Sequence, residues 1–222
     1  MITFDNQWEE VHKSREWGRY PSEEVIRFVA RNFYNKDRKQ IRLLDAGCGT
    51  GAIAWYLARE SFDTYGFDGS ETALKKAKKR MKDEDLRIQF RLADACSIPY
   101  EDLFFDGVVD SGMIVANTIE GIKKILGECY RVLKTGGKFF STALFRREMT
   151  GYGTGIQLEE HTFRNITKGS LSGIGTIHFF DQDEIRELWT EIGFKNIKID
   201  YCERSDNNGQ ETVSHFFVEA EK

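Results

Sequence analysis

The chain has 222 residues, 32 basic and 36 acidic, which gives a formal net charge of −4. This length suits one domain with embellishments better than two. A slightly acidic chain has no overall positive field to draw it to phosphate backbones or anionic lipids, so neither nucleic acid nor a membrane is an expected partner.

The sequence also argues against secretion and against a metal site. Its first residues lack the basic cluster and apolar run of a signal peptide, and no stretch has the roughly 20 apolar residues that cross a bilayer. The four cysteines are scattered and form no CxxC pair, as in proteins that keep their thiols reduced. We therefore expect a cytoplasmic protein without a bound metal.

Two helices are expected in residues 1–40, which we interpret as a helical cap. Trp8, Val11 and Trp17 indicate a short first helix, and Ser22 is a candidate N-cap for the second. The expected apolar face of this second helix consists of Val25, Ile26, Val29 and Phe33.

From residue 42 onward, short apolar runs alternate with longer amphipathic stretches, which predicts a parallel sheet with helices on both faces. The expected strands are residues 41–46, 63–68, 88–93, 105–110, 138–144, 197–204 and 214–221, and the expected helices are residues 51–61, 71–82, 119–133 and 181–192. Residues 205–209 form a turn too short for a crossover helix, so the last two strands pair antiparallel.

These elements define one α/β domain over residues 1–222, a doubly wound, Rossmann-like, mostly parallel sheet of seven strands with an antiparallel C-terminal hairpin. Residues 146–177 interrupt the alternation of strands and helices, because they are Gly-rich and weakly periodic. Such a segment inside a compact domain is usually functional or mobile. We interpret it as a lid inserted before the sixth strand.

The most informative stretch is residues 43–51, Leu-Leu-Asp-Ala-Gly-Cys-Gly-Thr-Gly, where an apolar strand runs into glycines and then a helix. Glycines suit a tight turn with positive φ and the close approach of a ligand to the backbone. Gly47, Gly49 and Ala52 also satisfy the G-x-G-x-x-G/A fingerprint of dinucleotide sites, so this stretch alone is ambiguous.

Two acidic residues end the next two expected strands. Asp68 is placed to accept hydrogen bonds from both hydroxyls of a ribose, a device shared by nicotinamide and S-adenosylmethionine enzymes. Asp94 follows the third strand, about where an adenine amino group can donate to it. This second acid favours S-adenosylmethionine, and a nicotinamide-dependent oxidoreductase is the competing enzyme class.

The residues now resemble a known family, the class I S-adenosylmethionine-dependent methyltransferases, in their small-molecule branch. The likeness runs from about residue 42 to the C-terminus. Besides the glycine turn, it rests on residues 104–110 (Phe-Phe-Asp-Gly-Val-Val-Asp), residues 128–138 with their Arg-Val-Leu-Lys-x-Gly-Gly block, residues 178–180 (His-Phe-Phe) and residues 191–194 (Glu-Ile-Gly-Phe). The resemblance implies a methyltransferase with S-adenosylmethionine as its cofactor.

It also implies roles for single residues. Asp45, Gly47 and Gly49 would hold the methionine portion and the ribose edge of the cofactor. Asp68 would bind both ribose hydroxyls, whereas Asp94 and Ala95 would face the adenine. Asp110 and Ser111 would lie near the methionine amino group or the reactive methyl. Ala46, Cys48, Gly69 and Ser70 complete the expected cofactor set.

The acceptor side is less defined, because residues 111–117 depart from the paired histidines that often follow the family's fourth strand. His161 and His178 are the candidate catalytic bases, whereas His12 and His215 are expected at the surface or in packing. The candidate substrate-binding residues are Trp17, Arg19, Tyr20 and Met113.

Polar residues in the lid favour a small polar acceptor, such as a sugar or nucleotide-sugar. They are Tyr152, Gln157, Glu159, Glu160, Arg164, Asn165 and Lys168. Transfer to oxygen and transfer to nitrogen both remain open, as does the oligomeric state. The alternative from outside enzymology is a noncatalytic S-adenosylmethionine-binding or scaffold protein.

Overall fold

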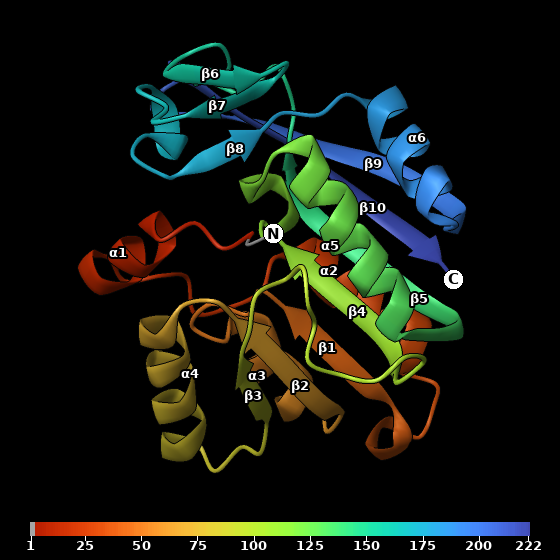
Figure 1. Ribbon diagram of the computed structural model, residues 1–222. Coiled ribbons are helices and arrows are strands. Elements are labelled where there is room, and N and C mark those ends of the chain that lie inside the picture. The colour runs from red at the N-terminus through yellow and green to blue at the C-terminus, as the bar shows by residue number, and fades with distance from the viewer. Residues whose placement is uncertain (1–2) are drawn as a thin grey trace.

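Seven strands form the central sheet in the order β3-β2-β1-β4-β5-β10-β9 (Figure 1). The computed structural model describes residues 3–222. The strands are β1 (Arg42–Ala46), β2 (Asp63–Asp68), β3 (Gln89–Leu92), β4 (Phe105–Ser111), β5 (Leu133–Phe145), β9 (Lys195–Asp206) and β10 (Glu211–Glu221). The first five run parallel, and β10 pairs antiparallel with both β5 and β9. The predicted sheet and its C-terminal hairpin are therefore confirmed.

Helices flank this sheet. They are α1 (Gln7–Ser14), α2 (Glu23–Phe33), α3 (Ala52–Arg59), α4 (Glu71–Asp83), α5 (Ile119–Val132) and α6 (Gln182–Ile192), with short 3-10 turns η1 (Arg38–Gln40), η2 (Ile114–Ala116) and η3 (Gly169–Leu171). Side chains cap two of them, since the Ser70 hydroxyl accepts from the Ala73 N–H at 3.0 Å and the Asp181 carboxylate from the Glu184 N–H at 2.8 Å. Within residues 3–222, no helix combines the length and apolar character needed to cross a membrane.

The central strands are buried on both faces, as expected for parallel strands between two helical layers. Successive residues enter different cores: Leu43, Val109 and Phe140 pack with α2 and α3, whereas Leu44, Val108 and Phe139 pack with α5 and α6. This alternation follows the two-residue period of a strand. This alternation fixes the register of β1 and β4, and therefore the position of their carboxyl ends at the edge of the sheet.

The N-terminal region divides into two parts with different environments. Helix α2 covers the sheet through the buried residues Val25, Phe28, Val29 and Phe33. The expectation for Ile26 was wrong, because this side chain is 39% exposed. Ser22 stands at the N-cap position, but its side chain makes no capping hydrogen bond. Only α1 lies out beside α4, at the left of Figure 1.

The inserted segment contains a sheet of its own, at the top of Figure 1. Its three antiparallel strands are β6 (Ile156–Glu159), β7 (Thr162–Arg164) and β8 (Thr176–His178). The sequence indicated only a weakly periodic lid, because strands of three or four residues are too short to display a period. The turn between β6 and β7 includes His161 with φ of 60°, in the left-handed region.

Substitution of Phe28 by alanine tests the placement of α2. The side chain is 2% exposed and stacks on Phe140, so its loss should lower the free energy of unfolding by about 3–5 kcal/mol. The exposed Ile26→Ala is the matched control on the same helix, expected to change stability by at most about 0.5 kcal/mol. Urea unfolding of both variants measures the difference, and equal losses would contradict the described orientation of the helix.

Candidate functional site

The turn from β1 into α3 passes through three glycines in the left-handed region. Gly47, Gly49 and Gly51 have φ of 67°, 50° and 84°, values that residues with a Cβ rarely adopt. At Gly47 a second constraint applies, because a Cβ there would lie 2.5 Å from the Cβ of Met113. The glycines thus allow both the sharp turn and the close packing of the loop that follows β4.

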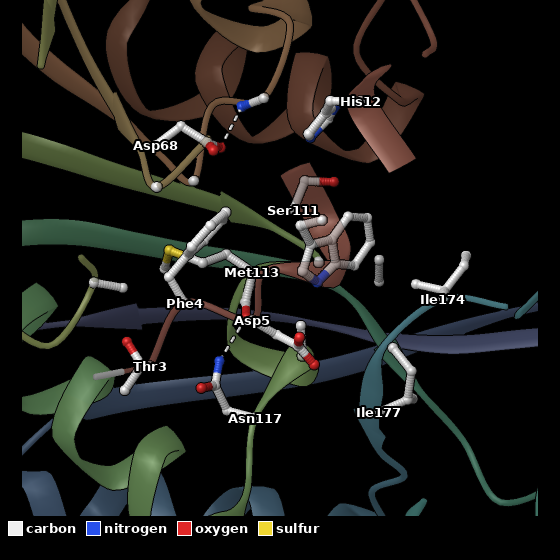
Figure 2. Close-up of a pocket in the computed structure, with 18 of the residues that line it drawn as sticks. Thr3, Phe4, Asp5, His12, Asp68, Ser111, Met113, Asn117, Ile174 and Ile177 are labelled. Atoms are coloured by element: carbon white, nitrogen blue, oxygen red, sulfur yellow. Dashed lines mark hydrogen bonds between the residues drawn. The ribbon is translucent and has the colours of Figure 1, made fainter. Parts of the chain in front are cut away.

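Asp68, at the end of β2, joins this turn to the next one. Its Oδ2 accepts from the Gly49 N–H at 2.8 Å, and its Oδ1 accepts from the Ser70 N–H at 2.7 Å. Burial raises the pKa of the carboxyl above its usual value, against the effect of these hydrogen bonds. Asp68 also lines a cavity, where its oxygens can accept further hydrogen bonds (Figure 2).

Two cavities adjoin at the carboxyl ends of the strands, the usual ligand site of open α/β sheets. The larger, called the first cavity, has a volume of about 240 Å³ and lies between the strand ends, α1 and the lid. The second lies toward Tyr20, Pro21 and the start of α3. Both are lined by Trp17, Gly47, Gly49 and Ser111. A ligand can therefore extend from one cavity into the other across the glycine turn.

Asp94 is engaged by the N-terminal segment. Its carboxylate accepts from the N–H groups of Thr3, Phe4 and Cys96 at 2.8–2.9 Å and from the Thr3 hydroxyl. Burial favours the neutral acid, but these hydrogen bonds outweigh it and lower the pKa of Asp94 to about 2. Thr3 and Phe4 line the first cavity with Ala95, so they stand where the sequence predicts an adenine (Figure 2).

The Phe4 ring also explains the glycine that follows Asp68. A Cβ on Gly69 would lie 2.2 Å from the Phe4 ring, so a larger residue at this position would push the ring away. The N-terminal segment is thus fitted to the β2–α4 turn.

Asp45 and Asp110 differ from Asp68 in being enclosed by protein. Asp45 accepts from the Ala54 N–H at 2.8 Å and lines the second cavity. Asp110 accepts from the Ser141 hydroxyl at 2.6 Å and from the Met113 N–H at 2.9 Å. Burial raises the pKa of Asp45 to about 8 and that of Asp110 to about 6. Asp110 therefore supports the loop that carries Ser111 and Met113.

The remaining expected cofactor and substrate residues are distributed unevenly. Cys48 and Tyr20 line the second cavity, and Met113 the first. Ala46 is buried in the core, whereas the Ser70 hydroxyl caps α4. Arg19 is exposed, and its carbonyl accepts from the Arg80 guanidinium at 2.6 Å.

The two candidate catalytic histidines lie in the lid network. The His178 ring is fully buried, with Nδ1 2.7 Å from the Thr162 hydroxyl and Nε2 3.1 Å from a Glu184 oxygen. His161 Nδ1 lies 2.7 Å from the Tyr152 hydroxyl. The structure places neither ring among the described residues that line the two cavities. The contacts of His178 instead join β7, β8 and α6, and that of His161 lies within the lid.

Residues that the sequence did not single out complete the first cavity. From the N-terminal region come Phe4, Asp5 and His12, and His12, expected at the surface or in packing, is only 5% exposed and lines the cavity. The loop after β4 adds Asn117, and the lid adds Leu171, Ile174 and Ile177. The four-residue spacing of Trp8 and His12, which puts both on one face of α1, is the signal that indicates a shared role.

Sheet, glycine turn and strand-end carboxylate together define an α/β domain that binds a nucleoside-containing cofactor. Comparison with known proteins assigns the domain more closely. Residues 43–137 match the family described as a methyltransferase domain. This match covers somewhat less than half of the chain, and it agrees with the resemblance to the class I S-adenosylmethionine-dependent methyltransferases.

Relatives and solved structures agree with this assignment. The demethylmenaquinone methyltransferase of Leptospira interrogans is 33% identical over 61% of this chain and 53% of its own length. The ubiquinone biosynthesis O-methyltransferase of Roseobacter denitrificans is 30% identical over 70% of this chain and 60% of its own length. The chain thus spans between half and two thirds of these relatives. A S-adenosylmethionine-dependent methyltransferase structure from Methanosarcina mazei shares the fold, with a TM-score of 0.70, 21% identity and coverage of 85% of this chain and 95% of that one.

Replacement of Asp68 by alanine should weaken binding of S-adenosylmethionine by about 1.5–3 kcal/mol, because it removes a charged hydrogen-bond acceptor from the cavity. Calorimetric titration with S-adenosylmethionine and S-adenosylhomocysteine measures the effect. Asp63→Ala is the control, since Asp63 begins the same strand at its opposite end. Unchanged affinity in a folded Asp68→Ala protein would refute the ribose-binding role.

The raised pKa of Asp45 predicts a pH effect on stability in the absence of ligand. Between its ordinary value of 3.8 and about 8, the folded protein holds a proton on Asp45 that the unfolded chain releases, so the free energy of unfolding falls as pH rises through this range. Asp45→Asn removes this contribution. Urea unfolding at pH 4, 6 and 8 should therefore show the asparagine variant gaining on the wild type as pH rises, and a constant difference would contradict the assignment.

Proposed function

We propose that this chain transfers the methyl group of S-adenosylmethionine to an oxygen or nitrogen of a small molecule. The observation that carries the proposal is the pair of cavities meeting at Gly47, Gly49 and Ser111, directly at the ends of β1 and β4. In this arrangement the methionine portion occupies the second cavity and the ribose lies beside Asp68 in the first. Ser111, which lines both cavities, would then lie near the reactive methyl.

When bound, the cofactor supplies a methyl group on a positively charged sulfur, which is already strongly electrophilic. Gly47, Gly49 and Asp68 would hold this group, and it would supply its methyl to a lone pair of the acceptor oxygen or nitrogen, whose proton would leave to solvent. The chain's own residues therefore have to align the acceptor and exclude water. Residues of the lid and of α1 line the first cavity from two sides and would contribute to the latter.

The acceptor side of the first cavity favours a molecule with an apolar body. Leu171, Ile174 and Ile177 reach it from the lid, with Phe145 from β5 and Trp8 from α1. Ile174 and Ile177 are labelled in Figure 2. Burial of such surface against an acceptor stabilises the complex by roughly 25 cal/mol per Å². The names of the two relatives, which refer to demethylmenaquinone and to ubiquinone biosynthesis, also suggest acceptors with flat apolar bodies.

Two of the polar lid residues that favoured a sugar, Glu159 and Arg164, bind other parts of the protein. Glu159 accepts from the Ile119 N–H at 2.6 Å and from the Thr162 hydroxyl at 3.0 Å, and Arg164 contacts the Asp5 carboxylate at 3.2 Å. A sugar or nucleotide-sugar acceptor is the second candidate, supported by the polar side chains of Asp5 and Asn117 in the first cavity. The cytoplasmic location stays a prediction.

Release of S-adenosylhomocysteine from the purified protein tests the reaction. We expect product with a hydroxylated bicyclic aromatic acceptor and none with a nucleotide-sugar. Product with the nucleotide-sugar alone would restore the polar acceptor, and tight cofactor binding without product from any acceptor would favour the noncatalytic alternative. A nicotinamide dinucleotide serves as the negative control for binding.

Ile174→Ser tests which part of the cavity holds the acceptor. The Ile174 side chain is only 6% exposed, and the substitution removes its apolar surface from the cavity. It should therefore raise the acceptor's KM roughly tenfold and leave S-adenosylhomocysteine binding unchanged. Ile156→Ser is the matched control, since Ile156 belongs to the same lid but is 58% exposed. Equal losses of acceptor and cofactor affinity would contradict this division of the site.

A further inference from the structure

His12 is a buried imidazole that faces the glycine turn from α1. Its Cε1 and Nε2 lie 3.6 and 3.9 Å from the position that a Cβ on Gly49 would take, and the ring lines the first cavity. The side chain is only 5% exposed. Within the described residues 3–222, Nδ1 is buried and has no hydrogen-bond partner. A buried polar atom without a partner is costly, and its presence at a cavity points to a ligand.

The surroundings of His12 show that this placement is built into the fold. Glu9, one turn earlier, accepts from the Ser70 hydroxyl at 2.5 Å and from the Thr72 N–H at 3.3 Å, at the start of α4. The Lys76 ammonium donates to the His12 carbonyl oxygen at 2.7 Å. These contacts dock α1 against α4 beside the end of β2, so the imidazole is held over the junction of Gly49 and Asp68.

Burial favours the neutral form of the ring, against the effect of the nearby acidic groups. Burial lowers the pKa of His12 and Lys76 acts in the same direction, whereas Asp68 and Glu9 raise it, with a net lowering. The Trp8 and Trp17 rings, with centroids 6.2 and 5.9 Å from that of His12, bring no charge. A neutral imidazole has one N–H and one lone pair, so it can donate to or accept from a hydroxyl.

We propose that His12 is a second ribose-binding residue, acting from α1 at the junction of Gly49 and Asp68. The inference rests on the proposed function, because it takes the cofactor's ribose as the ligand. Both oxygens of Asp68 already accept one backbone N–H, and each has room for one further donor. His12 supplies a hydrogen-bonding group to the same pair of hydroxyls from another element. Cofactor binding then fastens α1 to the sheet.

Titration with three ligands tests this role: S-adenosylhomocysteine and its 2′-deoxy and 3′-deoxy analogues. His12→Ala should weaken S-adenosylhomocysteine about tenfold, the scale of one hydrogen bond. For the analogue that lacks the contacted hydroxyl, wild type and variant should bind nearly equally. Lys13→Ala, which changes an exposed neighbour on the same helix, is the matched control and should bind all three ligands like the wild type.

Other outcomes would overturn the inference. Unchanged binding of S-adenosylhomocysteine to His12→Ala would refute any contact, and an equal loss for all three ligands would show that the ring acts only in packing. If the alanine variant does not fold, His12→Gln, which keeps polar atoms and much of the volume, carries the same comparison. Failure of the wild type to bind any of the ligands would instead contradict the proposed function, and the inference with it.

Discussion

The Asp68 carboxylate holds together the two turns on which the site depends. One oxygen binds the N–H of Gly49, in the turn after β1, and the other binds the N–H of Ser70, in the turn after β2. Since β1 and β2 are parallel neighbours, their turns emerge at the same edge of the sheet. One charged group therefore sets the spacing between the glycine turn and the start of α4, and α1 is docked against that start.

Much of the fold could be predicted because its signals are local and repeated. The double burial of β1 and β4 shows in sequence as short apolar runs, and the turn before β10 leaves no room for a helix. The lid sheet could not be predicted in this way. Its strands are held by contacts such as that of Thr162 with His178, which join residues whose own patterns are too short to read.

The site was only partly predictable for a related reason. Acids at strand ends are visible in sequence because the strand itself marks their position, and Asp45 and Asp68 do lie at the cavities. The contact of Thr3 with Asp94 spans 91 residues, and no local pattern announces it. The polar lid residues suggested a polar ligand, but a side chain's polarity does not reveal whether it binds a ligand or its own protein. Glu159 and Arg164 bind other residues of the protein.

The N-terminal segment links two parts of the molecule that the sheet keeps apart. Thr3 and Phe4 are bound to Asp94 beyond β3, and Asp5 is bound to Arg164 in the lid. Any ligand that donates a hydrogen bond to Asp94 competes with this segment for the same oxygens. Its apparent free energy of binding is therefore the difference between the free energy of its own contacts and that of the contacts it replaces. Because the same segment reaches the lid, displacing it also frees Arg164. Binding of a ligand at Asp94 and release of the lid from the N-terminal segment therefore report the same displacement.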